Sequence, residues 1–567
     1  MTAKQEIKKI IEKITKEFSL ENVNFSIEIP TDKNHGDYST NIALLLSKKM
    51  GKKSLPDGRQ AKELAEEIKK RIGENKIFEK IEIAGPGFIN FFIKEKVFID
   101  NLKQINKDYG KSSSLKNKKI VIDYTDPNPF KDFHIGHLMN NAIGESLSRI
   151  FEFNGAKVKR VCFQGDVGMH VAKAIWGKIK NPNLDWGKAY SYGSIMYEEN
   201  ENEKKEIQEL NKKIYEKSDK EINKLYEQGK KLSLDQFDKI YKKLGTEFDD
   251  LIFESQVIDL GKKIVEKGLN NGIFEKGLPA QAGGKGAIIF KGEKYNLHTR
   301  VFINSEGLPT YEAKDLGLAE LKYKKYKYNE SVVVTANEQN SHFAVMLCAM
   351  EKVLPELAKK TKHISHGMLK LPEGKMSSRT GNIITADALI EKLEQLVNEK
   401  IKEKDFSEKE KLEVLKKVAI GAIKYSILKQ SIGSDIIYDF DKSVSFDGDS
   451  GPYLQYSYAR AKSILEKAKE NKIKPSFKKI PEKITQLEKA MYYFPEIIEK
   501  ANNNYQPNII ALYLIDLARE FNNYYSNNKI VDKAGEFSSY KVALTYAFAQ
   551  IMENGLWLLG IKVLKKM

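Results

Sequence analysis

The fold class follows from one stretch of the chain, Ile120-Val121-Ile122-Asp123-Tyr124-Thr125-Asp126-Pro127-Asn128-Pro129-Phe130-Lys131-Asp132-Phe133-His134-Ile135-Gly136-His137. Its β-branched start favours a buried strand over 120–124, and a loop with two prolines follows. A helix is predicted over 136–153, because Asn154-Gly155 is a typical helix end, and a second strand over 158–163. Strand, loop, helix and strand form a βαβ unit, which predicts a doubly wound parallel sheet.

The same pattern returns later in the chain. The run Ser331-Val332-Val333-Val334-Thr335 predicts a strand that begins a second half of the sheet. Between the halves, residues 195–255 are highly charged, and their Glu and Lys spacing predicts solvated helices inserted between the two halves. We therefore predict a Rossmann-type catalytic domain over 107–405 with a helical insertion near 195–255.

Different patterns flank this domain. Helices are predicted over 1–20, 38–50 and 59–71, followed by two strands around Gly85-Pro86-Gly87. Residues 1–106 are therefore predicted to form an α+β domain. Strand signals stop near residue 405, so 406–567 is predicted to be an all-α domain. The fold class expected for the whole chain is multidomain α/β.

Composition narrows the class of protein. The 567 residues include 95 Lys and Arg against 78 Asp and Glu, a formal net charge of +17. This excess favours a polyanionic partner, although a generally lysine-rich composition explains it equally well. The two cysteines, Cys162 and Cys348, make a disulfide framework implausible and indicate a reducing cytoplasm. We find no membrane-spanning apolar run, no signal peptide and no Cys/His cluster typical of zinc.

Two segments predict a nucleotide site. His134 and His137 share one face at a helix start, where free N–H groups and the helix dipole attract phosphate, and Gly136 leaves room for a flat ring. The imidazoles could donate hydrogen bonds to charge that develops on phosphate oxygens; alternatively, they are two surface histidines. The second segment is a hydroxyl-rich loop that could close over a triphosphate, with Lys375 and Arg379 on the pyrophosphate. It reads Gly374-Lys375-Met376-Ser377-Ser378-Arg379-Thr380-Gly381-Asn382, and an ordinary basic turn is the alternative.

These two segments, in this order, resemble the HIGH and KMSKS motifs of class I aminoacyl-tRNA synthetases. Within that class the chain resembles the arginyl-tRNA synthetase family, whose Ser-Pro-Asn is similar to Asp126-Pro127-Asn128. Lys131 matches a lysine that the family places three residues before the first histidine. Ser378 stands where the loop usually has its second lysine, which leaves the separate roles of Lys131 and Lys375 open.

The resemblance also implies an arginine site. It assigns Asp123, Asn128, Tyr311, Asp315 and Gln339 to this site. A guanidinium needs acceptors in its plane, for which Asp315 and Asp123 are suited. Asn128 and Gln339 could hold the α-ammonium and carboxylate groups. For single members, such as Tyr311, packing remains the alternative.

Residues in both flanking domains are implied to meet tRNA. Asn90 and Phe91 are expected near a D-loop base, and core packing is the alternative for them. Anticodon contacts are implied for Tyr453, Tyr456, Arg460 and Met567, where stacking on bases competes with packing as the explanation. The run Gly165-Asp166-Val167-Gly168-Met169-His170 keeps only the first Gly-Asp of the family's Gly-Asp-Trp-Gly-Thr-Gln, and we assign it no catalytic role.

The implied activity is that of an arginine–tRNA ligase. Arginine and ATP, accompanied by Mg²⁺, would give arginyl-adenylate and pyrophosphate, and arginine would pass to the 3′ end of tRNA(Arg). A cytoplasmic monomer is expected. Three alternatives are a class I synthetase for another amino acid, a small adenylyltransferase of the same superfamily, and a non-enzymatic RNA-binding paralogue. The sequence leaves open whether tRNA must bind before activation.

Overall fold

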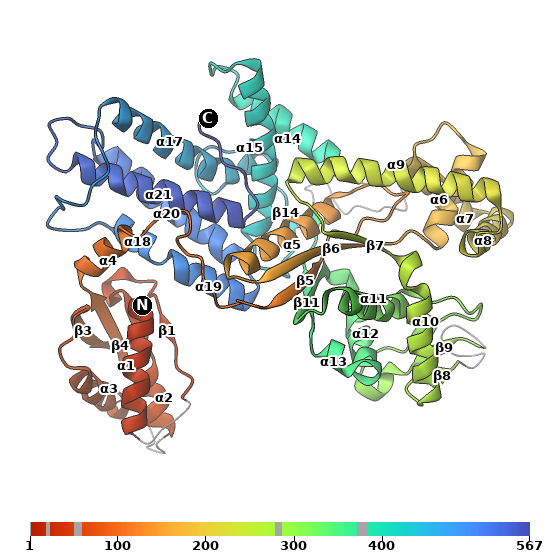
Figure 1. The fold of residues 1–567 in the computed structure, drawn as a ribbon, viewed down its shortest axis with the longest axis horizontal. Helices are drawn as coiled ribbons and strands as arrows, with labels where there is room; N and C mark the ends of the chain where they lie inside the picture. The colour runs from red at the N-terminus through yellow and green to blue at the C-terminus, as the bar shows by residue number, and fades with distance from the viewer. Residues whose placement is uncertain (1, 19–22, 50–58, 278–285, 371–383) are drawn as a thin grey trace. The chain divides into compact units, whose positions relative to one another are not determined.

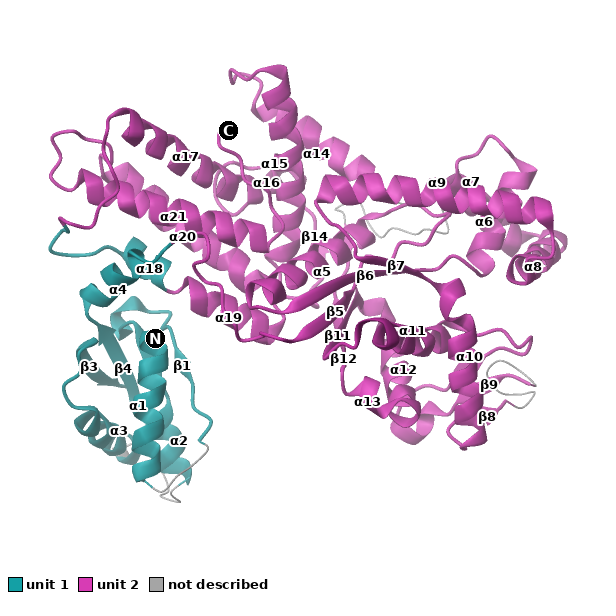
Figure 2. Cartoon of the chain, in the orientation of Figure 1, with its two compact units in different colours: residues 1–105, 480–492 teal, residues 106–479, 493–567 magenta. Residues whose placement is uncertain are grey.

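The computed structural model describes residues 2–18, 23–49, 59–277, 286–370 and 384–567. These residues form two compact units (Figure 2). One comprises residues 1–105 with 480–492, and the other comprises 106–479 with 493–567. No helix in the described part of the chain is long and apolar enough to cross a membrane.

The first unit is an antiparallel sheet with helices, in the strand order β1-β2-β4-β3. Its strands are β1 (Ile27–Glu28), β2 (Tyr38–Thr40), β3 (Phe78–Ala84) and β4 (Phe88–Ile93). Its helices are α1 (Ala3–Glu17), α2 (Ile42–Lys49), α3 (Arg59–Ile72), α4 (Glu95–Leu102) and α18 (Gln486–Tyr492). The amphipathic helix predicted at the N-terminus is α1, whose Ile7, Ile11 and Ile14 are buried.

The helix predicted over 38–50 is wrong in its first residues. Tyr38–Thr40 form strand β2, which pairs with β4, and the helix begins at Ile42. Tyr38 and Thr40 are 0% and 1% exposed. Their aromatic and β-branched side chains suit a strand, and pairing with β4 overrides the apolar periodicity of the residues that follow.

The second unit is built on a five-stranded sheet, in the order β12-β11-β5-β6-β7, in which every neighbouring pair is parallel. The strands are β5 (Lys119–Asp123), β6 (Lys157–Gln164), β7 (Asp250–Phe253), β11 (Glu330–Ala336) and β12 (Thr361–His366). The chain proceeds from β5 to β6 and β7 on one side and later occupies the other side with β11 and β12. The direction of winding therefore reverses between β5 and β11, which is where doubly wound sheets bind ligands.

Helices surround this sheet and extend from it (Figure 1). They are α5 (Ile135–Phe153), α6 (Met169–Lys180), α7 (Trp186–Glu199), α8 (Glu201–Glu216), α9 (Lys220–Leu244), α10 (Glu254–Asn270), α11 (Tyr311–Tyr326), α12 (Asn340–Val353) and α13 (Pro355–Ala358). Helices are present across the predicted insertion, but Asp250–Phe253 near its end form strand β7. Sequence reasoning also missed a small sheet of β8 (Glu275–Lys276), β9 (Ile288–Phe290) and β10 (Arg300–Ile303).

The C-terminal part is helical, as predicted, apart from a two-residue strand. Its helices are α14 (Ala386–Lys400), α15 (Glu408–Leu428), α16 (Phe440–Ser443), α17 (Gly451–Glu470), α19 (Phe494–Asn504), α20 (Asn508–Asn527) and α21 (Ser538–Leu558). The short strand β14 (Ile436–Ile437) pairs with β13 (Leu369–Lys370). The apolar sides of these helices are buried in a core; for example, Leu514, Phe521 and Phe548 are fully buried.

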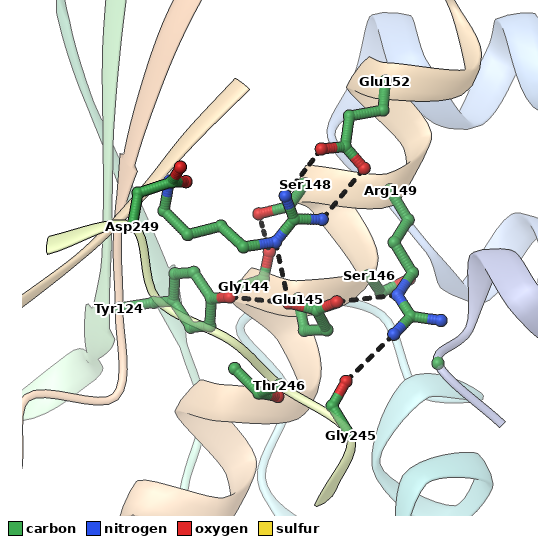
Figure 3. A network of polar contacts seen from close by, with 12 residues as sticks. Tyr124, Gly144, Glu145, Ser146, Ser148, Arg149, Glu152, Gly245, Thr246 and Asp249 are labelled. Carbon is green, nitrogen blue, oxygen red and sulfur yellow. Dashed lines mark hydrogen bonds and ion pairs between the residues drawn. The ribbon is translucent and has the colours of Figure 1, made fainter. Parts of the chain in front are cut away.

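Helix α5 is anchored through its C-terminal half by a polar network (Figure 3). Glu145, 3% exposed, accepts hydrogen bonds from the Tyr124 hydroxyl at 2.7 Å, from Arg149 Nε at 2.7 Å and from Arg160 Nε at 3.0 Å. Arg149 also donates to the carbonyl oxygens of Gly245, which ends α9, and of Trp557 in α21. Because a buried carboxylate is stable only when it is fully paired, this network holds α5 firmly against the sheet.

Candidate active site

A cavity of about 580 Å³ opens at the carboxyl ends of β5 and β11. It lies at the switch point of the sheet, as expected for this topology. Eight of the predicted site residues line it: Asp123, Asn128, His134, Gly136, His137, Tyr311, Asp315 and Gln339. Residues widely separated in the sequence therefore meet in one cavity.

The loop that leads from β5 into α5 has an unusual backbone. Thr125, Asp126 and Phe130 have φ angles of 83°, 47° and 69°, which non-glycine residues rarely adopt. Such conformations persist only where surrounding contacts impose them. Asp126 Oδ1 accepts a hydrogen bond from the Phe163 N–H at 2.8 Å, and the Phe130 N–H donates to Ser233 Oγ at 2.9 Å.

The two histidines are held by the backbone at the start of α5. His134 Nδ1 accepts from the Gly136 N–H, and His137 Nδ1 accepts from the His134 N–H, each at 3.2 Å. Their rings stack with centroids 3.7 Å apart. Since each Nδ1 is an acceptor, the proton of the neutral ring must be on Nε2. Both imidazoles can therefore offer an Nε2–H donor.

The same histidines remain uncharged at neutral pH. Burial, with a smaller contribution from nearby Lys131, lowers the pKa of His134 to about 4. Burial lowers the pKa of His137 well below its usual value, helped by His134 and Lys131. The site therefore offers two neutral hydrogen-bond donors at a positive helix terminus, an arrangement suited to phosphate oxygens.

Asp315 is part of an ionic chain. Its Oδ2 lies 2.5 Å from His342 Nε2, and His342 Nδ1 lies 3.3 Å from Glu312 Oε1. Burial lowers the pKa of His342, but the two carboxylates outweigh burial and raise it to about 9. Glu312 also accepts from Arg300 at 3.0 Å. Protonated His342 thus fixes the orientation of the Asp315 side chain in the cavity wall.

Asp123 is buried more deeply and is also paired. Its Oδ2 accepts from Lys322 Nζ at 3.0 Å, and the two side chains are 1% and 3% exposed. Burial raises the pKa of Asp123 against the attraction of Lys322. Burial and the neighbouring charge of Asp123 raise the pKa of Asp126 well above its usual value. The structure places Asp123 in the lining but already pairs one of its oxygens with a lysine.

Sequence reasoning did not assign three carboxyl side chains of the cavity to the site, namely Asp126, Glu254 and Glu338. Glu254 begins α10 directly after β7 and pairs with Lys314 at 2.6 Å. Among the described residues, five carboxyl side chains line the cavity, against two cationic side chains, Lys322 and protonated His342. The carboxyl side chains are Asp123, Asp126, Glu254, Asp315 and Glu338. Such a lining favours a cationic ligand.

Comparison with known proteins identifies the family. Residues 99–440 match the family described as tRNA synthetases class I (R), catalytic domain. Residues 454–567 match the DALR anticodon binding domain, and residues 1–93 match the arginyl tRNA synthetase N terminal domain. The chain belongs to the arginyl-tRNA synthetase family. The predicted fold class and the predicted class I family are confirmed.

Individual relatives support the same family assignment. The chain is 32% identical to the arginine–tRNA ligase of Clostridium perfringens (strain 13 / Type A), covering 99% of this chain and 100% of the relative. It is 33% identical to that of Borreliella burgdorferi, covering 98% and 96%. The solved structure of Thermus thermophilus arginyl-tRNA synthetase superposes over 100% of both chains with a TM-score of 0.80, at 22% identity. That superposition supports the shared fold.

Lys131 does not line the main cavity of this family member. It borders a neighbouring cavity of about 610 Å³ together with Trp186 and Thr385. Its Nζ lies 4.5 Å from the centre of the Tyr190 ring. The predicted loop residues Lys375, Met376, Ser377, Ser378 and Arg379 lie outside the described residues. No group of three or more His, Cys, Asp and Glu within the described ranges could hold a metal ion.

The segments on either side of that loop reach the site. Leu369 lines the main cavity. After the loop, Ile384 accepts a hydrogen bond from the Ile135 N–H at 3.3 Å, and the Ala386 N–H donates to Phe133 at 2.8 Å. The segment after the loop therefore lies beside the first turn of α5, and the segment before it lines the main cavity.

The N-terminal residues predicted to meet tRNA lie in the sheet of the first unit. Asn90 and Phe91 on β4 are 3% and 1% exposed, and the Phe91 ring lies 5.1 Å from that of Phe78. Phe88 on the same strand is 39% exposed. A base could reach Phe88 more readily than Phe91, whose ring is occupied by core packing.

The C-terminal residues cluster. Tyr456, Arg460 and Met567 line a shallow pocket of about 340 Å³ with Tyr525. The Arg460 guanidinium lies 4.8 Å from the Tyr456 ring centre and 5.1 Å from that of Tyr525. Tyr453 joins the cluster through Asn522, which donates to its hydroxyl at 2.9 Å and accepts from Arg460 at 2.5 Å. The cluster combines aromatic faces with a cation, as single-stranded nucleic acid requires.

Proposed function

We propose that the chain is an arginine–tRNA ligase that activates L-arginine with ATP and transfers it to the 3′ end of tRNA(Arg). One observation carries this proposal. A single cavity joins two neutral Nε2–H donors at a helix N-terminus with a wall of carboxylates. The first feature suits the phosphates of ATP, and the second suits the guanidinium of arginine.

In the first step, the arginine carboxylate attacks the α-phosphorus and pyrophosphate leaves. His134 and His137 stabilise charge on the phosphate oxygens through their Nε2–H groups. Lys375 and Arg379 neutralise the leaving pyrophosphate, a role supported by the position of the residues that flank their loop. Mg²⁺ would arrive with ATP and would offset part of its negative charge. The terminal ribose hydroxyl of tRNA then attacks the activated carbonyl, and AMP leaves.

Arginine lies across the carboxylate wall. Asp315 accepts from the guanidinium, with Asp123 and Glu254 close by in the lining. Tyr311, 59% exposed, covers the amino acid at the cavity mouth. Asn128 and Gln339 hold its carboxylate and α-ammonium groups. Catalysis is therefore achieved by positioning and charge stabilisation, without a protein nucleophile.

The tRNA contacts are placed at both ends of the chain. Anticodon bases stack within the cluster of Tyr453, Tyr456, Arg460 and Met567, supported by its open aromatic faces. The sheet around Asn90 and Phe91 meets the D-loop, and the exposed ring of Phe88 on the same strand is available to a base. We place the enzyme in the cytoplasm as a monomer and keep Lys131 among the residues proposed to bind ATP.

Aminoacylation of total tRNA with each of the twenty amino acids tests the proposed function. We expect charging with arginine alone, because only its side chain is a delocalised cation that matches several carboxylate acceptors. Charging of another amino acid would refute the substrate assignment. Binding of tRNA without any charging would favour the non-enzymatic alternative.

The low pKa values of the two histidines predict the pH dependence of arginine activation. Because His134 has a pKa of about 4, both rings stay neutral from about pH 5.5 to about pH 8, and their titration should not change the rate in that range. The rate of ATP–pyrophosphate exchange at saturating substrates measures this. An inflection near the ordinary histidine pKa that disappears in His134→Gln would contradict it.

A further inference from the structure

The segment that follows β6 borders the cavity, although the proposed function gives it no role. Gly165 lines the cavity, and its N–H donates to Asn128 Oδ1 at 2.9 Å. Its carbonyl oxygen lies 2.8 Å from His170 Nε2. The Gly165 N–H is therefore bonded to Asn128, a proposed substrate contact, and the Gly165 carbonyl oxygen is bonded to the buried His170.

The contact with Gly165 determines how Asn128 faces a ligand. A backbone N–H needs an acceptor, so the amide oxygen of Asn128 must point to Gly165 and its Nδ2 must point elsewhere. The side chain makes no other hydrogen bond to a described residue, which leaves Nδ2 for the ligand. Nδ2 can only donate, so its partner must be an oxygen acceptor such as a carboxylate and cannot be an ammonium. A Cβ atom at Gly165 would lie 2.6 Å from Asn128 Oδ1, so only glycine permits this approach.

His170 can serve only as a donor here. Burial lowers its pKa to about 3, with a smaller contribution from Lys131, so the ring is neutral. A carbonyl oxygen can only accept, so the proton must be on Nε2 and His170 donates to Gly165. The histidine is 8% exposed, and water cannot readily replace this hydrogen bond.

Asp166, the next residue, ties the same peptide to the helical insertion. It is 0% exposed and accepts four hydrogen bonds. Two come from Ser255 at the start of α10, from its N–H at 2.9 Å and its Oγ at 2.7 Å. The others come from α9, from Lys230 Nζ at 2.7 Å and the Tyr226 hydroxyl at 3.0 Å. The insertion therefore restrains the peptide that orients Asn128.

We propose that His170 and Asp166 are positioning residues for the carboxylate of the amino-acid substrate. Together they fix Gly165, and Gly165 fixes Asn128 with its Nδ2 directed at the carboxylate. This inference rests on the proposed function, since it assumes that arginine occupies the cavity. It also assigns a function to the helical insertion, because α9 supplies two of the donors that hold Asp166.

Calorimetric binding of L-arginine and agmatine to the full chain tests this proposal. Agmatine keeps the guanidinium but lacks the carboxylate. His170→Leu should weaken arginine binding about tenfold, as expected when Asn128 loses its hydrogen bond to the charged carboxylate of the ligand, and leave agmatine binding unchanged. His170→Gln keeps a side-chain donor and should restore most of the arginine affinity. A merely structural role would weaken both ligands equally, which would overturn the proposal.

A double variant tests whether His170 acts through Asn128. Combining His170→Leu with Asn128→Ala should weaken arginine binding no more than Asn128→Ala alone, because both act through one amide; additive losses would overturn the proposal.

Asp166→Asn should also weaken the binding of arginine without weakening that of agmatine. Asp37→Asn is its control, because Asp37 is also buried and accepts from a backbone N–H and a lysine, within the first unit; a selective loss there too would overturn the proposal. An unaltered chain that binds neither ligand would refute the proposed function itself.

Discussion

His137→Ala should lower the rate constant of arginine activation by about 100- to 1000-fold, the usual cost of removing one preorganised donor from a developing negative charge. The His137 ring is held by the His134 N–H and stacked on the His134 ring. Its Nε2–H therefore costs little reorganisation when charge develops on the α-phosphate. The measurement is ATP–pyrophosphate exchange with tRNA present, beside tRNA affinity determined separately.

The matched control for this prediction is His137→Gln. Glutamine keeps a donor near the position of Nε2 but loses the rigid ring, so we expect a smaller loss, of about tenfold. The affinity for tRNA should be nearly unchanged in both variants, because the anticodon contacts that we propose, Tyr453, Tyr456, Arg460 and Met567, lie outside α5. Equal losses of activation and tRNA affinity in His137→Ala would show that the histidine supports the fold and has no catalytic role.

The residues that could be predicted from sequence are those whose chemistry is local. His134, Gly136 and His137 lie together at the N-cap and in the first turn of one helix, so a strand followed by a helix start was enough to place them at a phosphate site. Asp315 and Tyr311 share the first turns of α11 in the same way. Their common cavity depends on the parallel sheet, whose topology follows from the βαβ pattern.

Other parts of the site depend on contacts between distant segments, which no local sequence pattern predicts. Glu254 becomes a cavity residue only because the four-residue strand β7 pairs with β6, and such a short strand is hidden among charged residues. On β4, alternation shows that Phe88 and Phe91 face opposite sides, but only the packed helices decide which side is buried. Likewise, the partners of Asp166 come from α9 and α10, far along the chain.

Asp315→Asn should raise the arginine KM by about 10- to 100-fold, because a hydrogen bond to a charged group contributes about 1.5–3 kcal/mol. Initial rates of aminoacylation against arginine concentration measure this. The preference for arginine over citrulline, its neutral isostere, should decrease in the same variant, because the lost carboxylate is the acceptor that binds a positive charge more strongly than a neutral group. Glu312→Gln is the matched control, because Glu312 contacts His342 from the other side without lining the cavity. If Glu312→Gln raises KM equally, the effect acts through His342; an unchanged KM in Asp315→Asn removes Asp315 from the arginine site.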